Sequence, residues 1–165
     1  MLGVDHPDTL TGRINLALAY QTAGRLVEAV PLFEATVTHC ERVLGPDHPH
    51  TLSSRHNLAD AYQAVGRLAE AVPLFEASLT DRERVLGVDH PDTLTSRITL
   101  ALAYQAIGRL AEAVPLFEAT VTDCERLLGP DHPDTLVSRH ALALAYRAVG
   151  RLADAIPLQD ADGTG

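Results

Sequence analysis

Residues 2–10 read LGVDHPDTL, and closely similar stretches begin at Leu44, Leu86 and Leu128. The period is 42 residues, and no insertion interrupts it. Self-similarity at such a period is typical of arrays in which each copy is one supersecondary unit. We therefore predict a single array over residues 1–165, with copies at approximately residues 2–43, 44–85, 86–127 and 128–160, the last of them truncated.

Each copy contains two amphipathic segments with the periodicity of an α-helix. In the first copy they cover about residues 7–23 and 26–43. Gly24 is expected to take the left-handed conformation that ends the first helix, and Gly45 ends the second. Pro31 is expected to bend the second helix without breaking it. Two such helices cannot bury both apolar faces alone, so neighbouring copies should stack into an all-α superhelix with a concave side and a convex side.

A Leu-Ala pair, a tyrosine, a glycine, an alanine and a phenylalanine recur at fixed spacing in the first three copies. In the first copy they are Leu16, Ala17, Tyr20, Gly24, Ala29 and Phe33. This spacing resembles the tetratricopeptide repeat, and the 42-residue period with its DHPDTL linker resembles the longer subtype of kinesin light chains and related bacterial proteins. Arg13 departs from that pattern, which usually has an aromatic residue there. The resemblance implies a right-handed α-solenoid of helix-turn-helix repeats that binds a peptide or partner protein and has no catalytic activity.

The resemblance also implies that a partner binds on the concave side, which the first helix of each copy lines. We call these positions the first-helix face. Several of them vary between copies, as expected of an interaction surface but also of neutral drift. The partner-binding residues expected on this face are Ile14, Asn15, Leu18 and Gln21, then His56, Asn57, Asp60 and Gln63, then Ile98, Leu102 and Gln105, and finally His140, Leu144 and Arg147.

Composition excludes several other kinds of partner. The net charge of −9 would repel nucleic acid and anionic membrane surfaces. No apolar run approaches the roughly 20 residues of a membrane helix, and the first residues do not have the pattern of a secretion signal. We therefore expect a cytoplasmic protein. All 13 basic residues are arginine, which suggests a GC-rich bacterial gene.

No cofactor, metal site or catalytic site is expected. One histidine of each linker (His6, His48, His90 and His132) is too far from the next to share a metal ion, so we interpret these residues as helix caps. Cys40 and Cys124 occupy the same position in different copies and are interpreted as free thiols in packing positions. Arg25 and Glu28 have the spacing of an exposed helix ion pair.

Three functions stay open at this stage. The first is a scaffold that holds a peptide or partner protein on the first-helix face. The second is a self-assembling module, because no polar capping helix is evident and uncovered repeats are expected to stack head to tail or swap. The third is a regulatory fragment of a larger signalling protein. Exposure of Ile14, Leu18, Ile98 and Leu102 to solvent would favour a ligand, whereas their burial between copies would favour self-assembly.

Overall fold

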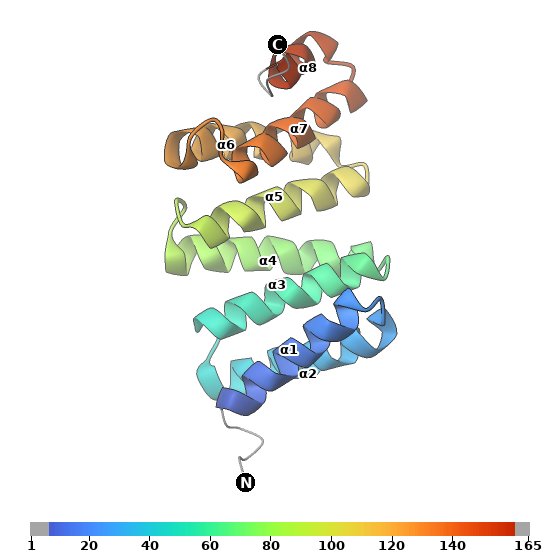
Figure 1. The fold of residues 1–165 in the computed structure, drawn as a ribbon, viewed down its shortest axis with the longest axis vertical. Helices are drawn as coiled ribbons and strands as arrows, with labels where there is room; N and C mark the ends of the chain where they lie inside the picture. The colour runs from blue at the N-terminus through green and yellow to red at the C-terminus, as the bar shows by residue number, and fades with distance from the viewer. Residues whose placement is uncertain (1–6, 161–165) are drawn as a thin grey trace. The chain divides into compact units, whose positions relative to one another are not determined.

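The computed structural model describes residues 7–160, and its regular elements are helices joined by short turns. Figure 1 shows them as successive antiparallel hairpins. The predicted fold class is confirmed, and the helix boundaries in the first copy differ from the expected ones by a single residue at each C-terminus. The helices are α1 (Pro7–Thr22), α2 (Leu26–Leu44), α3 (Pro49–Ala64), α4 (Leu68–Leu86), α5 (Pro91–Ala106), α6 (Leu110–Leu128), α7 (Pro133–Ala148) and α8 (Leu152–Asp160).

The chain forms two compact units, Met1–Asp81 and Arg82–Gly165. The division falls in the last turns of α4, so the first unit contains α1–α3 and most of α4. Each unit has a hydrophobic cluster of its own, one around Phe33 and the other around Phe117. The single array over residues 1–165 stays a prediction.

The turn inside each hairpin depends on a glycine. Gly24 has φ +73°, in the region that only glycine enters without strain, and the next amide, that of Arg25, donates to the carbonyl of Tyr20 at 2.8 Å. Gly108 repeats this conformation with φ +78°. The expected left-handed C-terminus is therefore confirmed. Pro31 lies inside the continuous helix α2, as predicted.

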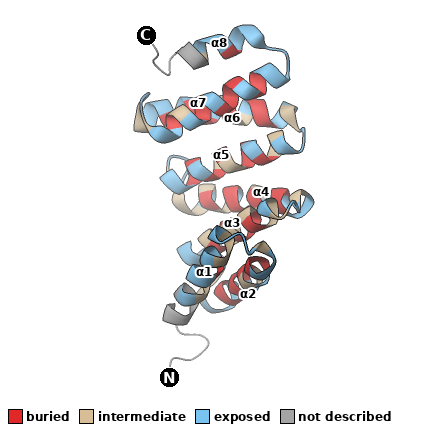
Figure 2. Ribbon diagram, turned by 45° about the vertical axis from the view of Figure 1, so that its right-hand side comes forward, coloured by how far each residue is buried: buried red, intermediate tan, exposed pale blue. Residues whose placement is uncertain are grey.

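The two sides of each helix differ in burial (Figure 2). Phe33 of α2 and Phe117 of α6 are fully buried and form the centres of the two clusters. Small residues such as Ala17 and Ala29 lie beside Phe33 and are also fully buried, so the two backbones can approach closely. Side chains fixed in a dense core of this kind stabilise the pairing of consecutive helices.

A set of three polar side chains connects the second helix of one repeat to the next repeat. In the first unit the Tyr62 hydroxyl donates to Glu34 Oε1 at 2.7 Å, and the Arg67 guanidinium lies over the Tyr62 ring at 4.1 Å. The second unit repeats the arrangement with Tyr146, Glu118 and Arg151. We call each set a seam cluster: Glu34, Tyr62 and Arg67 in the first unit, and Glu118, Tyr146 and Arg151 in the second.

Burial and the hydrogen bond to Glu118 raise the pKa of Tyr146 to about 12. The pKa of Tyr62 is raised for the same two reasons, burial first and the hydrogen bond to Glu34 second. Both phenols therefore stay protonated, and remain donors to their carboxylates, over the whole physiological pH range.

An arginine early in a first helix links three helices. Arg97 of α5 donates through Nη2 to Glu83 of α4 at 2.8 Å and through Nη1 to Asp123 of α6 at 2.7 Å. In the first unit Arg55 binds Glu41 and Asp81 in the same way. Each of these two arginines thus forms a two-sided ion pair with the helices before and after its own.

Two further expectations concern single side chains. Cys40 and Cys124 are buried free thiols, and burial raises the pKa of Cys124, so they are packing residues as interpreted. The Arg25 guanidinium binds Glu28 Oε1 at 2.9 Å on the exposed surface, which confirms the predicted ion pair.

Candidate functional site

The first-helix face of the second unit contains a pocket between α5 and α7. Its volume is about 430 Å³. Most of its lining is apolar, with one amide and one imidazole. The lining residues are Leu102 and Gln105 from α5, and Leu136, Val137, His140, Ala141 and Leu144 from α7.

The local sequence explains why leucines line this pocket. Leu102 stands between Ala101 and Ala103, which are fully buried in the core. Because consecutive helix residues point about 100° apart, the leucine between two core residues faces the other way. Leu102 is 39% exposed, and Leu144 of α7, in the same setting, is 40% exposed. The alanines allow close helix packing, and the leucines remain on the outer side.

The first unit presents a more polar first-helix face. Leu18 is exposed, as expected for a ligand contact, and Asn15 is exposed beside it. His56 is buried: its ring contacts Phe75 edge-on with centroids 5.6 Å apart, and its Nε2 lies 3.6 Å from Asp60 Oδ2. His56 therefore packs against the core and does not offer an open imidazole.

The expected partner-binding residues differ in exposure. The pocket brings Leu102, Gln105, His140 and Leu144 together. Arg147 is exposed in the last turn of the same helix, α7. Ile98 and His56 are buried, and the remaining expected residues Ile14, Gln21, Asn57, Asp60 and Gln63 are half-buried.

Leu136 lines the pocket and was not expected on this face. It belongs to the recurring Thr-Leu pair of the linker, whose other members Leu52 and Leu94 are buried core residues. Leu136 is only half-buried. The repeat motif is the same around Leu136, Leu52 and Leu94, so it could not predict that Leu136 is more exposed. The exposure of each leucine depends on the side chains that pack around it.

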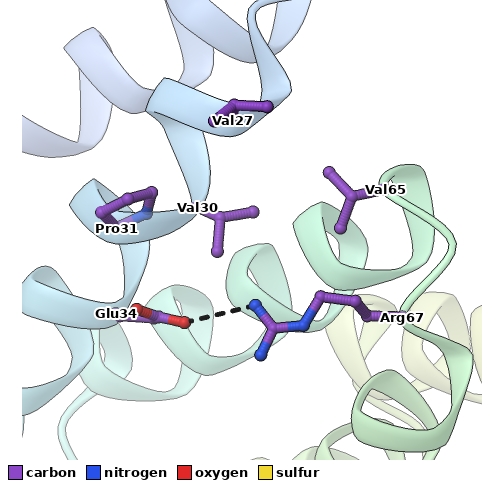
Figure 3. Close-up of a pocket in the computed structure, with 6 residues that line it drawn as sticks. All are labelled: Val27, Val30, Pro31, Glu34, Val65 and Arg67. Carbon is purple, nitrogen blue, oxygen red and sulfur yellow. Dashed lines mark ion pairs between the residues drawn. The ribbon is translucent and has the colours of Figure 1, made fainter.

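A second pocket, in the first unit, has a volume of about 310 Å³ (Figure 3). It lies where α2 meets the turn after α3, and two of its lining residues, Glu34 and Arg67, belong to the seam cluster. Arg67 Nη1 lies 3.6 Å from Glu34 Oε1 across its floor. The ion pair and the nearby phenol already satisfy the polar groups of this pocket. Its lining residues are Val27, Val30, Pro31, Glu34, Val65 and Arg67.

The described residues contain no group of three or more His, Cys, Asp or Glu side chains placed to hold a metal ion. His48, His90 and His132 instead cap helices, each accepting a backbone hydrogen bond through Nδ1. No helix among residues 7–160 is long and apolar enough to cross a membrane.

Comparisons with known proteins agree with this architecture. The family model described as tetratricopeptide repeat matches residues 8–83, 56–123 and 99–160. The chain is similar to a crystal structure from Podosopora anserina described as a kinesin light chain with nearly identical TPR-like repeats. The identity is 41%, the TM-score is 0.84, and the match covers 98% of this chain and 76% of that one.

A crystal structure of a variant of that protein gives 39% identity and a TM-score of 0.86, with 97% of this chain and 76% of that chain covered. BtubC (BKLC) from P. vanneervenii shares the fold, with a TM-score of 0.85 at 21% identity over 94% of this chain and 62% of that one. A search of curated proteins finds no match.

Proposed function

Because the chain belongs to the tetratricopeptide repeat family, whose members are scaffolds for protein–protein interaction, we propose that it binds a peptide segment of a partner protein on its first-helix face. The anchor of the segment is an apolar side chain that enters the pocket between α5 and α7. Polar groups around this pocket orient the peptide backbone, and no catalytic step is involved.

One observation carries this proposal: leucines from two different first helices lie exposed around a single cavity. Leu102 and Leu144 are each about two-fifths exposed, although they are large apolar residues that lie away from the helix ends. Clustered exposed apolar residues around a concavity mark binding sites more often than isolated ones do. A ligand that covers both leucines removes this apolar surface from water.

The pocket matches one large apolar side chain and its neighbours. Its volume of about 430 Å³ lies within the range of roughly 300–1,000 Å³ that is typical of ligand sites. Full burial of a leucine or phenylalanine anchor contributes about 1.5–3 kcal/mol to binding. This contribution supports weak, reversible recognition, which further backbone contacts strengthen.

Polar side chains supply those further contacts. The amide of Gln105 can donate to and accept from a peptide backbone at the pocket edge. In the first unit Asn15 and Asn57 offer the same chemistry on α1 and α3. The net charge of −9 favours a segment with basic residues beside its apolar anchor.

Selection from a displayed library of random peptides tests the proposal. Peptides are selected on the wild type and then counter-selected on Leu102→Glu/Leu144→Glu, whose substitutions lie at exposed positions and should leave the melting temperature nearly unchanged. We expect peptides with a large apolar residue and basic flanks, and at least about tenfold weaker binding to the double variant, the equivalent of about 1.4 kcal/mol.

Val88→Glu is the matched control, because Val88 is an exposed apolar residue of the second unit that lies outside the pocket. It should bind the selected peptides as the wild type does. Peptides that bind the double variant and the wild type equally well would show that the pocket is not the site.

A second candidate function is self-association, and one specific observation favours it. Ile156 of α8 is more than half exposed, whereas the equivalent Val30, Val72 and Val114 are buried. Sedimentation velocity over a wide concentration range tests this function, and a species that stays monomeric throughout would exclude it.

A further inference from the structure

Two apolar side chains of α8, Leu152 and Ile156, are exposed, and Figure 2 colours most of the described part of this helix as exposed. Ile156 is 58% exposed, but its equivalents Val30 and Val114 are 6% and 7% exposed. The reason is visible within each unit. Val30 clusters with Leu58 and other residues of the following helix α3, and Val114 clusters in the same way with residues of α7.

On α1, residues that pack against a preceding second helix elsewhere in the chain are exposed. Leu16 is 45% exposed, whereas its equivalents Leu58 and Leu142, which contact the preceding second helix, are 6% and 3% exposed. Ala19 is exposed too, while its equivalent Ala145 is fully buried. These α1 residues are of the type that covers Val30 and Val114 elsewhere in the chain.

The two uncovered surfaces are therefore the two halves of a contact that the chain already makes twice, between α2 and α3 and between α6 and α7. We propose that α8 of one copy docks on α1 of a second copy in the register of those two contacts. Ile156 then meets Leu16 and Ala19 of the second copy, as Val30 meets Leu58 and Ala61. The inference rests on the self-association proposed above and specifies its surfaces.

The arrangement of Tyr20 and Arg25 on the α1 side supports the same register. In each seam cluster, a glutamate of a second helix accepts a hydrogen bond from a tyrosine of the next repeat. The same glutamate forms an ion pair with the arginine five residues after that tyrosine, as Glu118 does with Tyr146 and Arg151. On α1 and the turn after it, Tyr20 and Arg25 already have the required arrangement, with the Arg25 guanidinium 4.4 Å from the Tyr20 ring centroid.

A contact between two different surfaces has a defined consequence for assembly. Each copy keeps one free α8 or one free α1 after the first contact, so addition continues as the concentration rises. Blocking either surface on all copies stops assembly. Mixing copies blocked at α8 with copies blocked at α1 restores a single contact, and the product is a dimer that cannot grow.

Sedimentation velocity over a hundredfold concentration range tests this with four samples. They are the wild type, Ile156→Glu, Ala19→Glu, and an equimolar mixture of the two variants. Both positions are exposed, so each variant should keep the wild-type circular dichroism and melting temperature. We expect the wild type to grow beyond a dimer, each variant alone to associate at least about tenfold more weakly, and the mixture to stop at a 1:1 dimer.

Two controls separate the possible failures. Val88→Glu and the pocket variant Leu102→Glu/Leu144→Glu lie outside both surfaces and should assemble as the wild type does. A wild type that stays monomeric overturns both self-association and its register. Association that persists in both variants, or a mixture that forms no dimer, overturns the α8–α1 register and leaves self-association through another surface.

Discussion

Three linker histidines, His48, His90 and His132, position the starts of α3, α5 and α7. The Nδ1 atoms of His48, His90 and His132 accept the backbone amide two residues further on, at 3.2, 3.1 and 3.2 Å. Serine, threonine, aspartate and asparagine usually provide this N-cap acceptor. Here the imidazole does so, and the following proline needs no hydrogen bond of its own at the first helical position.

Replacing His132 by alanine should lower the free energy of unfolding by about 1 kcal/mol, the usual cost of losing an N-cap. The His132→Asn variant retains a short side-chain acceptor and should recover most of that loss. Urea unfolding of the two variants and the wild type measures both differences. An equal loss in the alanine and asparagine variants would show that the ring acts through packing and not as an acceptor.

Because of the buried phenol of Tyr146, the stability of the fold should decrease at alkaline pH. Its pKa is about 12 in the folded state against 10.0 for an ordinary tyrosine. A pKa raised by folding means that the protonated hydroxyl stabilises the fold, so its contribution is complete below pH 10 and is lost as the pH rises through about 12. We expect the melting temperature to fall less steeply over this interval in Tyr146→Phe than in the wild type. Parallel curves for the two proteins would contradict this assignment.

Among the first helices, α3 and α5 are each held from both sides by an arginine. The Arg97 side chain is mostly buried and joins Glu83 and Asp123, which come from the helices before and after α5. Hydrogen bonds between charged groups in such settings are stronger than exposed ones, and removal of one partner leaves the carboxylates without compensation. The ion pairs therefore help to define the angle at which consecutive helices pack.

Substitution of Arg97 by methionine should lower the free energy of unfolding by about 1.5–3 kcal/mol, since charged hydrogen bonds are lost while the aliphatic volume is kept. Arg126→Met is the matched control. Arg126 also binds Asp123, at 3.0 Å, but is half exposed, so its loss should change stability little. Denaturant unfolding measures both, and a similar effect of the two substitutions would show that burial does not strengthen the Arg97 pairs.

At the scale of the whole molecule, the contacts of each helix are mainly with its neighbours in sequence. The two hydrophobic clusters belong to different units, with Phe33 central to one and Phe117 to the other. In such quasi-one-dimensional proteins stability is close to a sum of repeat and nearest-neighbour contributions. Local damage should therefore remain local.

Phe117→Ala should remove about 3–5 kcal/mol, the usual cost of truncating a buried phenylalanine. Amide hydrogen exchange should then accelerate mainly in α5–α8, whereas Phe33→Ala should affect mainly α1–α3. Mass spectrometry of peptic fragments compares the two variants directly. Uniform loss of protection along the chain in both variants would indicate that the two units unfold as one cooperative body.

Most of the fold could be predicted from the sequence, but only part of the candidate site. The period and the tyrosine and phenylalanine spacing identified the family, which the family model and the kinesin-light-chain-like structure confirm. Four of the expected first-helix residues do line the pocket, whereas Leu136 was not anticipated and the burial of Ile98 was not either. Whether the first-helix face binds a partner stays a prediction, which the peptide selection tests.

Features that depend on local backbone preferences could be read from the amino-acid sequence: where helices begin at His-Pro, where they end at Gly24 and its equivalents, and which side of each helix is apolar. Which members of one repeated position remain exposed depends instead on the packing of the folded chain. His56 packs on Phe75, whereas the equivalent His140 lines an open pocket. The reason is physical, because the exposure of a side chain depends on the neighbours that other helices bring to it, and those neighbours change from copy to copy while the repeat motif does not.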